Sequence, residues 1–391
     1  MRKIVIIGGG FVGLRVARLL GKKTAGRAVV TLIDRNDRFV FSPWLIDELA
    51  GEMDRDDISE SYADAARRGG FTFVQGEAMV MDRETKLVEV KYADGRTSSL
   101  EYDWLVMAPG AKVAYYGIPG AEEHALPLKS LADVVRLHER LKKLVDRART
   151  ATPDQAANLM HFVVVGGGPT GIESLFALKR YLMHELLADN PRLAGMLKFT
   201  LVDAMPQILN GFKTNIVSGA IKALERQGVE IMVGDPAASV DAQSITFKSG
   251  KRIDGGLILW AAGVQPNDMP SKPEMPRNEK KQLQSDECLR LDHCVYAGGD
   301  AVTFMCDDGK PASRTAQTAM QQASMLVTNI LMCLNGQEPK PYHHVVNGTI
   351  LTFGDTGYLD TPWFGFLFPS VVPLRRLFYK FRFWQMTGRW A

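Results

Sequence analysis

Cysteine is scarce in this chain of 391 residues, and every cysteine lies after residue 287. The four are Cys288, Cys294, Cys306 and Cys333, and no two of them form a CxxC pair. This spacing matches no zinc or cluster pattern, so we predict no metal site, and free thiols are typical of reduced, intracellular proteins. The scarcity also excludes a redox cysteine pair anywhere in the first 287 residues.

Long apolar runs, low-complexity tracts and a targeting segment are missing as well. No window offers the roughly 18 uninterrupted apolar residues that a membrane-spanning helix needs. The chain begins MRKIVIIGGG, so the first predicted strand leaves no room for a signal peptide, and we expect the protein to stay inside the cell. The formal net charge is +3, and nothing in its distribution favours nucleic-acid binding.

The N-terminus carries a glycine-rich turn between a predicted strand and a predicted helix. The strand IVIIG leads into GxGxxG, and the helical pattern FVGLRVARLL follows. Glycines at this spacing let a pyrophosphate approach the backbone and the N-terminus of the helix. An aspartate at the end of the next strand can accept hydrogen bonds from a ribose. The predicted dinucleotide contacts are Gly8, Gly10, Phe11, Val12, Gly13, Asp34 and Arg35.

A second copy of the same pattern lies near the middle of the chain. The strand HFVVV runs into GGGPTG and a helical pattern, and a later strand, LKFTLVD, ends in Asp203. An acidic residue there favours a free ribose 2′-hydroxyl over a 2′-phosphate, so we predict NADH rather than NADPH. The expected contacts are Gly166, Gly168, Pro169, Thr170, Gly171 and Asp203.

Two such turns, with DWLVMAPGA after the first and VYAGGDAV near the end, resemble the two-dinucleotide flavoprotein reductases. The resemblance implies FAD at the first turn, NADH at the second, and Asp300 at the ribityl chain of the flavin. In DWLVMAPGA, Pro109 departs from the usual sequence of this motif, in which threonine is common at that position. Further cofactor contacts implied by the resemblance are Ala78, Ala108, Gly110, Ala262, Gly263 and Gly299.

The cysteines that other branches of this superfamily use to pass on electrons are missing here, which narrows the choice of electron acceptor. The stretch FVFSPWLIDELAGEM, where disulfide reductases carry their redox cysteines, has none, and the mid-chain cysteine of sulfide:quinone reductases is also missing. By contrast, AQTAMQQ, GGGPTGIE and WAAGVQPN resemble the type II NADH dehydrogenases, single-chain NADH:quinone oxidoreductases that do not pump protons. The resemblance covers roughly residues 1 to 330.

The segment AQTAMQQ is the predicted quinone site. In the resembled family its glutamines, here Gln317 and Gln321, line the quinone pocket at the flavin edge, beside Ala316. Glutamine amides can hydrogen-bond quinone carbonyls without titrating. The alternative is a helix start that packs on the flavin, with glutamines that cap backbone groups. The segment FSPWL, residues 41–45, resembles the family's loop beside the isoalloxazine, and the resemblance implies that Pro43 lies against the ring.

Glu173 follows the second glycine turn and admits two interpretations. A carboxylate near the nicotinamide could relay a proton to quinone if partial burial raised its pKa. The alternative is a structural salt bridge, or an interaction with the N-terminus of its helix.

The last 30 residues differ in kind from the rest of the chain. They hold five basic side chains, no acidic one, and ten of the 34 aromatic residues. Leu374, Leu377, Phe378, Phe381 and Trp384 share one helical face, with Arg375, Arg376, Lys380 and Arg382 expected to flank or oppose it. This pattern is typical of a helix that lies on a membrane surface. The same stripe could instead pack on the protein's own core or on a second subunit.

Together these features predict an α/β protein with two Rossmann-like domains. We expect a discontinuous FAD domain at 1–116 and 263–335, an inserted NADH domain at 117–262, and a C-terminal segment at 336–391 with the amphipathic helix. The expected activity is transfer of a hydride from NADH to FAD and of two electrons to a membrane quinone, at the cytoplasmic face of the cell membrane, with a homodimer as a further expectation. The alternatives are a soluble reductase of a small iron protein and an NADH-binding flavoprotein that signals.

Overall fold

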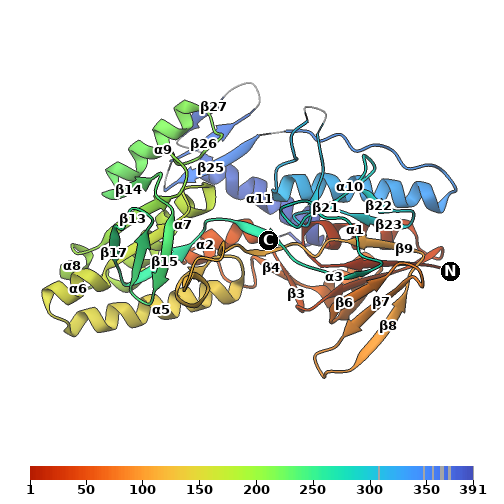
Figure 1. Ribbon diagram of the computed structural model, residues 1–391, viewed down its shortest axis with the longest axis horizontal. Helices are drawn as coiled ribbons and strands as arrows, with labels where there is room; N and C mark the ends of the chain where they lie inside the picture. Colours follow the sequence, from red (N-terminus) through yellow and green to blue (C-terminus); the bar gives the residue numbers. More distant parts are fainter. Residues whose placement is uncertain (307–308, 347, 355, 362–364, 369–370, 391) are drawn as a thin grey trace.

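Two mainly parallel sheets with a corresponding order of central strands form the body of the protein (Figure 1). The computed structural model describes residues 1–306, 309–346, 348–354, 356–361, 365–368 and 371–390. The first sheet has the order β22-β23-β9-β1-β2-β5 and the second β11-β18-β12-β13-β14. The strands of the first are β1 Arg2–Ile7, β2 Ala28–Asp34, β5 Thr72–Gln75, β9 Trp104–Met107, β22 Arg290–Asp292 and β23 Val295–Ala297. Those of the second are β11 Leu126–Pro127, β12 His161–Val165, β13 Lys198–Asp203, β14 Val229–Val233 and β18 Leu257–Trp260.

The repeated sequence pattern is therefore a repeated topology. The central strands are β1 and β12, with β2 and β5, or β13 and β14, following on one side. The chain then forms an antiparallel meander and crosses to the other side, into β9 or β18. The short strand β11 precedes β12 in the chain and lies at the edge of the second sheet. The meanders are β6 Glu77–Asp82, β7 Leu87–Lys91 and β8 Thr97–Glu101, and β15 Ala237–Asp241, β16 Ser244–Phe247 and β17 Arg252–Asp254. The central strand β12 is buried along its whole length, which explains why HFVVV does not alternate.

The first sheet is built from two separate parts of the chain. Strand β23 pairs in parallel with β9, with Val295 opposite Leu105, although the whole second sheet lies between them in sequence. The helix α10, Ala316–Leu334, then packs against α1, Phe11–Lys23, on this first unit. The predicted fold class, with one discontinuous and one inserted Rossmann-like unit, is thereby confirmed, while the residue boundaries of the two domains stay predictions.

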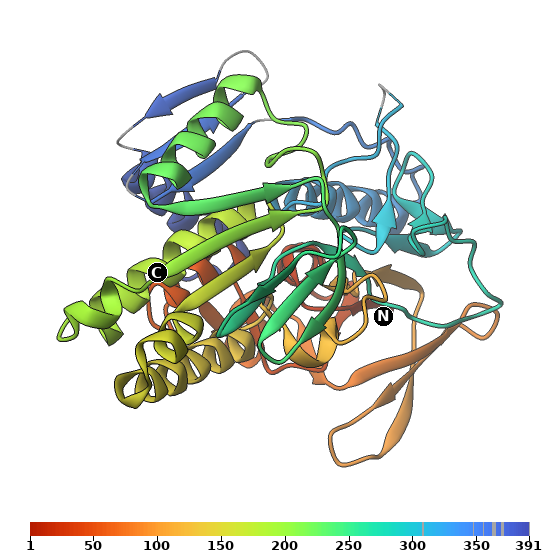
Figure 2. The ribbon, with the colours of Figure 1, turned by 60° about the vertical axis from the view of Figure 1, so that its left-hand side comes forward.

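A third sheet and a final helix follow the two Rossmann-like units. Strands β25 Thr349–Phe353, β26 Thr356–Asp360 and β27 Gly365–Phe368 form an antiparallel sheet beside α9, Thr214–Arg226 (Figure 2). The last helix, α11, spans Val371–Thr387 and contacts α1, β25 and β26. It thus joins the first unit to the C-terminal sheet.

Helix α11 turns one apolar face inward and another outward. Phe383 and Met386 are fully buried, and the Phe383 ring lies 5.2 Å from that of Trp44 and 6.0 Å from that of Phe41. Both rings belong to the FSPWL segment, residues 41–45. The outward side chains are the predicted stripe, with exposed fractions of 47% for Leu374, 59% for Leu377, 38% for Phe378, 41% for Phe381 and 44% for Trp384.

Arg375 lies opposite this stripe, which is one of the two placements expected for the basic residues of the helix. Its side chain is buried and forms an ion pair with Asp47 of the short helix α2, Leu45–Leu49, with Nη2 and Oδ1 2.6 Å apart. Sequence periodicity could not separate the inner face from the outer one, because apolar residues occupy both. Arg376 pairs with Glu52, and the guanidinium of Arg382 lies 4.8 Å over the Phe378 ring.

Truncation of an aromatic ring should change the stability of the protein far more on the inner face of α11 than on its outer face. Phe383→Ala should destabilise the protein by about 3–5 kcal/mol, because it leaves a cavity against Trp44. Phe381→Ala, the exposed counterpart, should stay within about 0.5 kcal/mol. Urea unfolding followed by tryptophan fluorescence measures both, and equal destabilisation by the two variants would show that α11 is docked differently.

Candidate functional site

Close backbone contacts fix the geometry of both glycine turns. Gly8 has φ +90, and a Cβ on it would lie 2.1 Å from the carbonyl oxygen of Ala108. A Cβ on Gly13 would lie 1.8 Å from the oxygen of Gly8, and one on Gly171 would lie 1.8 Å from the oxygen of Gly166. The first and last glycines therefore serve the turn and the approach of helix to strand.

The middle glycine of each turn faces open space instead. No heavy atom lies within 4 Å of a Cβ built on Gly10 or on Gly168. These two residues are the N-caps of α1 and of α7, Pro169–Tyr181, and neither helix start has a side-chain cap or an acidic residue in its first turn. Open space in front of uncapped N–H groups fits the pyrophosphate of a dinucleotide at both positions.

The strand-end aspartates make the same contact in both units. Asp34 Oδ2 accepts a hydrogen bond from the backbone N–H of Gly9 at 2.6 Å, and Asp203 Oδ2 accepts one from Gly167 at 2.5 Å. Each carboxylate thereby ties the end of the second strand to the glycine turn on the first. This anchors the acid beside the place where the ribose of a bound dinucleotide would lie.

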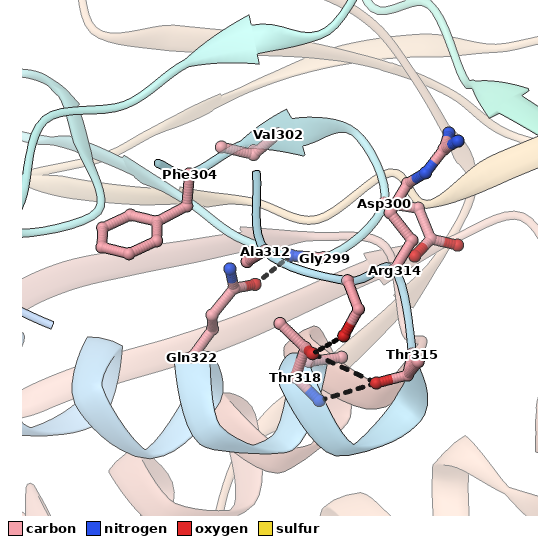
Figure 3. A pocket seen from close by; sticks show the side chains of 11 residues that line it. Gly299, Asp300, Val302, Phe304, Ala312, Arg314, Thr315, Thr318 and Gln322 are labelled. Carbon is pink, nitrogen blue, oxygen red and sulfur yellow. Dashed lines mark hydrogen bonds between the residues drawn. The ribbon is translucent and has the colours of Figure 1, made fainter. Parts of the chain in front are cut away.

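The loop after β23 meets the start of α10 (Figure 3). Gly299 has φ +80, and its N–H donates to Oε1 of Gln322 at 2.8 Å. Thr315 caps α10, accepting from the N–H of Thr318 at 3.2 Å. A pocket lies between this loop and α10, and Gly299, Thr315 and Gln322 line it. Asp300 follows Gly299 and lines the same pocket, which fits its expected place at a flavin ribityl chain. Gln322 was missed by the sequence reasoning, although it is the last letter of AQTAMQQ.

The carboxyl edges of the two parallel sheets face each other across this loop. Lys129 follows β11 of the second sheet, and its Nζ lies 4.0 Å from Oδ2 of Asp300 after β23 of the first. Tyr116 donates through its hydroxyl to the carbonyl of Ala262, which follows β18, at 3.0 Å. Dinucleotides bound at the two turns would therefore extend toward one another.

The two predicted quinone glutamines have different surroundings. Gln317 is half-buried in the first turn of α10. The Gln321 amide is bonded to the backbone of Val345, donating to its carbonyl at 2.8 Å and accepting from its N–H at 3.1 Å. The Tyr342 hydroxyl also donates to it, at 3.3 Å. Gln321 thus behaves as the alternative interpretation expects, as a cap for backbone groups.

Glu173 lies on α7 and is held by the C-terminal sheet. Its Oε1 accepts from the N–H of Thr352 at 2.9 Å and from the Thr352 hydroxyl at 2.7 Å. Burial raises the pKa of this carboxyl group, while Arg375 and the two hydrogen bonds oppose the rise. A raised pKa is what the proton-relay interpretation requires, and the nearby arginine keeps the ion-pair alternative open.

The other predicted contacts lie at the edges described above or beside them. Gly76, two residues before Ala78 on β6, donates from its N–H to the carbonyl of Asp34 at 2.9 Å. Phe11 and Val12 begin α1, Arg35 follows β2, Pro43 lies in the short helix Ser42–Trp44, Ala108 and Gly110 follow β9, Thr170 lies in α7, Gly263 follows β18, and Ala316 begins α10.

Comparison with known proteins agrees with this arrangement. The profile of the pyridine nucleotide-disulphide oxidoreductases matches residues 2–323. The type II NADH:quinone oxidoreductase of Staphylococcus epidermidis is 27% identical over 360 residues, 90% of this chain and 88% of that protein. The external alternative NAD(P)H-ubiquinone oxidoreductase B4 of Arabidopsis thaliana mitochondria is 28% identical over 320 residues, 78% of this chain but only 54% of the plant protein.

A solved structure has the same fold over the full length. NDH2 of Plasmodium falciparum, in complex with NADH, superposes with a TM-score of 0.88 and covers 100% of this chain and 95% of its own, at 19% identity. Two equivalent dinucleotide units with facing edges define a two-dinucleotide oxidoreductase. The chain belongs to the pyridine nucleotide-disulphide oxidoreductases. Among the relatives that it matches over most of their length is a type II NADH:quinone oxidoreductase.

The position of Asp203 predicts a preference between the two nicotinamide cofactors. A carboxylate at the ribose repels a 2′-phosphate, so kcat/KM with NADH should exceed that with NADPH by at least about tenfold, or ~1.4 kcal/mol. Asp203→Asn should narrow this ratio, whereas Asp189→Asn, a neutralisation of an exposed carboxylate in the same unit, should not. Steady-state assays with ferricyanide measure the ratio, and equal efficiencies in the unmodified protein would place Asp203 away from the ribose.

Proposed function

We propose that the protein oxidises NADH at the second glycine turn and reduces a membrane quinone near the start of α10, with FAD at the first turn. When bound, FAD supplies the redox chemistry that joins a two-electron donor to a quinone. The observation that carries the proposal is the approach of the two sheet edges at Lys129 and Asp300, 4.0 Å apart, since dinucleotides held at the two glycine turns would meet there.

The chain's own residues supply position and electrostatics. The helix starts at Gly10 and Gly168 bind pyrophosphates, Asp34 and Asp203 bind riboses, and Asp300 holds the ribityl chain. Gln322 keeps the loop of Asp300 in place through its bond to Gly299. Thr315, which caps the start of α10, lines the same pocket as Asp300, and the N-terminus of a helix favours negative charge there.

The quinone site is proposed at Gln317, with Gln321 as a supporting residue. The Gln321 amide is engaged by the backbone of Val345, so its role is to hold that segment against α10. Glu173 is proposed as a proton-transfer residue, because burial raises its pKa. A soluble partner such as a small iron protein would have no use for the exposed apolar face of α11.

That exposed face supports a peripheral membrane position. No helix in the described part of the chain is long and apolar enough to cross a membrane. Five apolar side chains of α11 nonetheless remain in contact with solvent, two of them the rings of Phe381 and Trp384, stacked with centroids 5.8 Å apart. Insertion of these side chains among lipid headgroups would bring the protein to its quinone. A homodimer stays a prediction.

The first test separates the two halves of the reaction. Gln317→Leu should leave reduction of the bound flavin by NADH near normal and slow its reoxidation by quinone at least about tenfold, because the amide that binds the quinone carbonyl is lost. Gln322→Leu is the contrasting variant and should lower flavin content by freeing the Gly299 loop. Stopped-flow absorbance follows both half-reactions, and equal slowing of both by Gln317→Leu would make this a packing position.

The second test concerns the membrane face. The double variant Leu377→Ser with Phe381→Ser should bind vesicles of anionic lipid at least about tenfold more weakly, since two apolar side chains lose their burial in lipid. Val29→Ser with Met205→Ser, two side chains exposed to 44% and 46% on the main body, is the matched control. Vesicle flotation gives the answer, and unchanged binding of the α11 variant would place the membrane contact elsewhere.

A further inference from the structure

A buried polar cluster lies where α2, α7 and α11 meet. Arg375 of α11 donates through Nη2 to Oδ1 of Asp47 at 2.6 Å, and its guanidinium lies 5.3 Å over the ring of Tyr379. The Asp47 side chain is 2% exposed and that of Arg375 is 6% exposed. Glu173 of α7 lies close enough to influence the charge state of all three groups.

Several atoms of this cluster are buried without a hydrogen-bond partner among the described residues. They are Oδ2 of Asp47 and both Nε and Nη1 of Arg375. Buried charged groups normally satisfy their remaining donors and acceptors through ordered water or a ligand. The cluster is therefore a place for water between two carboxyl groups and a cation.

In the buried part of the cluster, the guanidinium of Arg375 forms an ion pair with Asp47, and Glu173 is the second carboxyl group. Two further cations, Arg180 and Arg376, pair with Glu52 and are half-exposed. One proton bound by the two buried carboxyl groups lowers the cost of burying them in a region of low dielectric. Tyr379 stays neutral, because burial and the two carboxylates raise the pKa of its phenol.

The titration of Asp47 shifts in the direction that favours a bound proton. Burial raises the pKa of Asp47 to about 6, with Arg375 and Arg376 opposing the rise and Glu52 and Glu173 adding to it. The remaining charged or titratable groups around α2 are Glu48, paired with Arg55, Arg180, paired with Glu52, and His138 of α5 (Leu131–Thr150), whose ring contacts the carbonyl of Leu49. None of these places a further cation on Oδ2 of Asp47.

Quinone reduction needs a proton that NADH does not carry. In the overall reaction, NADH, one proton and a quinone give NAD+ and a quinol. NADH contributes two electrons and one proton, and the second proton comes from the medium. A buried site that stores a proton and refills from water can deliver it without opening the pocket to solvent.

We propose that Asp47 and Glu173 share this second proton across Arg375, so that Asp47 is the store from which Glu173 is recharged. Arg375 acts as a positioning residue that holds the two carboxyl groups and their water together. The proposal rests on the proposed function for the destination of the proton, but not for the shared proton itself. Because Arg375 comes from α11, the helix that carries the exposed apolar face also completes the proton store.

Infrared difference spectroscopy of the flavin-loaded protein, without NADH or quinone, tests the shared proton directly. A protonated-carboxyl band should disappear as the pH rises through about 6, and Asp47→Asn should abolish this titration. Glu173→Gln should move it to lower pH, because the charge that raises the pKa of Asp47 is gone. Asp47→Glu should restore a titrating band, and Asp57→Asn, at an exposed position in the following loop, should leave it unchanged.

Stopped-flow kinetics test the use of the proton. In the unmodified protein, reoxidation by quinone should slow as the pH rises above about 6, and Asp47→Asn should be at least about tenfold slower and nearly independent of pH there. Reduction by NADH should stay within about twofold in both proteins. Recovery of the pH dependence in Asp47→Glu excludes a purely structural role for the carboxyl group.

The outcomes separate the two proposals. An unchanged carboxyl titration in Asp47→Asn, or an unchanged pH profile of quinone reduction, overturns the shared proton. Absence of quinone reduction in the unmodified protein, with the titration of Asp47 still present, overturns the proposed acceptor and leaves the proton store established by its infrared band.

Discussion

The hydrogen bond from the backbone of the second residue of each glycine turn to the strand-end aspartate is the contact on which both dinucleotide units depend. It occurs as Gly9 to Asp34 and again as Gly167 to Asp203. In each case it fixes the turn relative to the second strand, and therefore fixes where the helix N–H groups point. The two units are thus copies of one device, and the chain between them sets only their relative placement.

Helix α11 gives the C-terminal part of the chain two tasks. Its inner face fills the space against Phe41 and Trp44, next to the loop expected beside the flavin, and brings Arg375 to Asp47. Its outer face leaves aromatic and aliphatic side chains in solvent. A helix with only the first task would not keep that apolar surface, and one with only the second would not need a buried arginine.

The fold was predictable because its signals are local. Neighbouring residues define the strands before both turns, the spacing of the glycines and the acids at the ends of the second strands. The structure has all of these features. The buried position of Arg375 and the bond from Gln322 to Gly299 were not predictable, because each joins segments that lie far apart in sequence. Periodicity found the outer stripe of α11 but could not say which residues its other side would meet.

In the proposed reaction, electrons from NADH leave this protein to a quinone. Steady-state NADH oxidation by the purified, FAD-loaded protein, compared among a quinone, a small iron–sulfur protein and a disulfide, tests it most directly. We expect rapid turnover with the quinone, slow turnover with the iron–sulfur protein and none with the disulfide. Faster turnover with the iron–sulfur protein, or slow turnover with every acceptor, would contradict the proposed reaction.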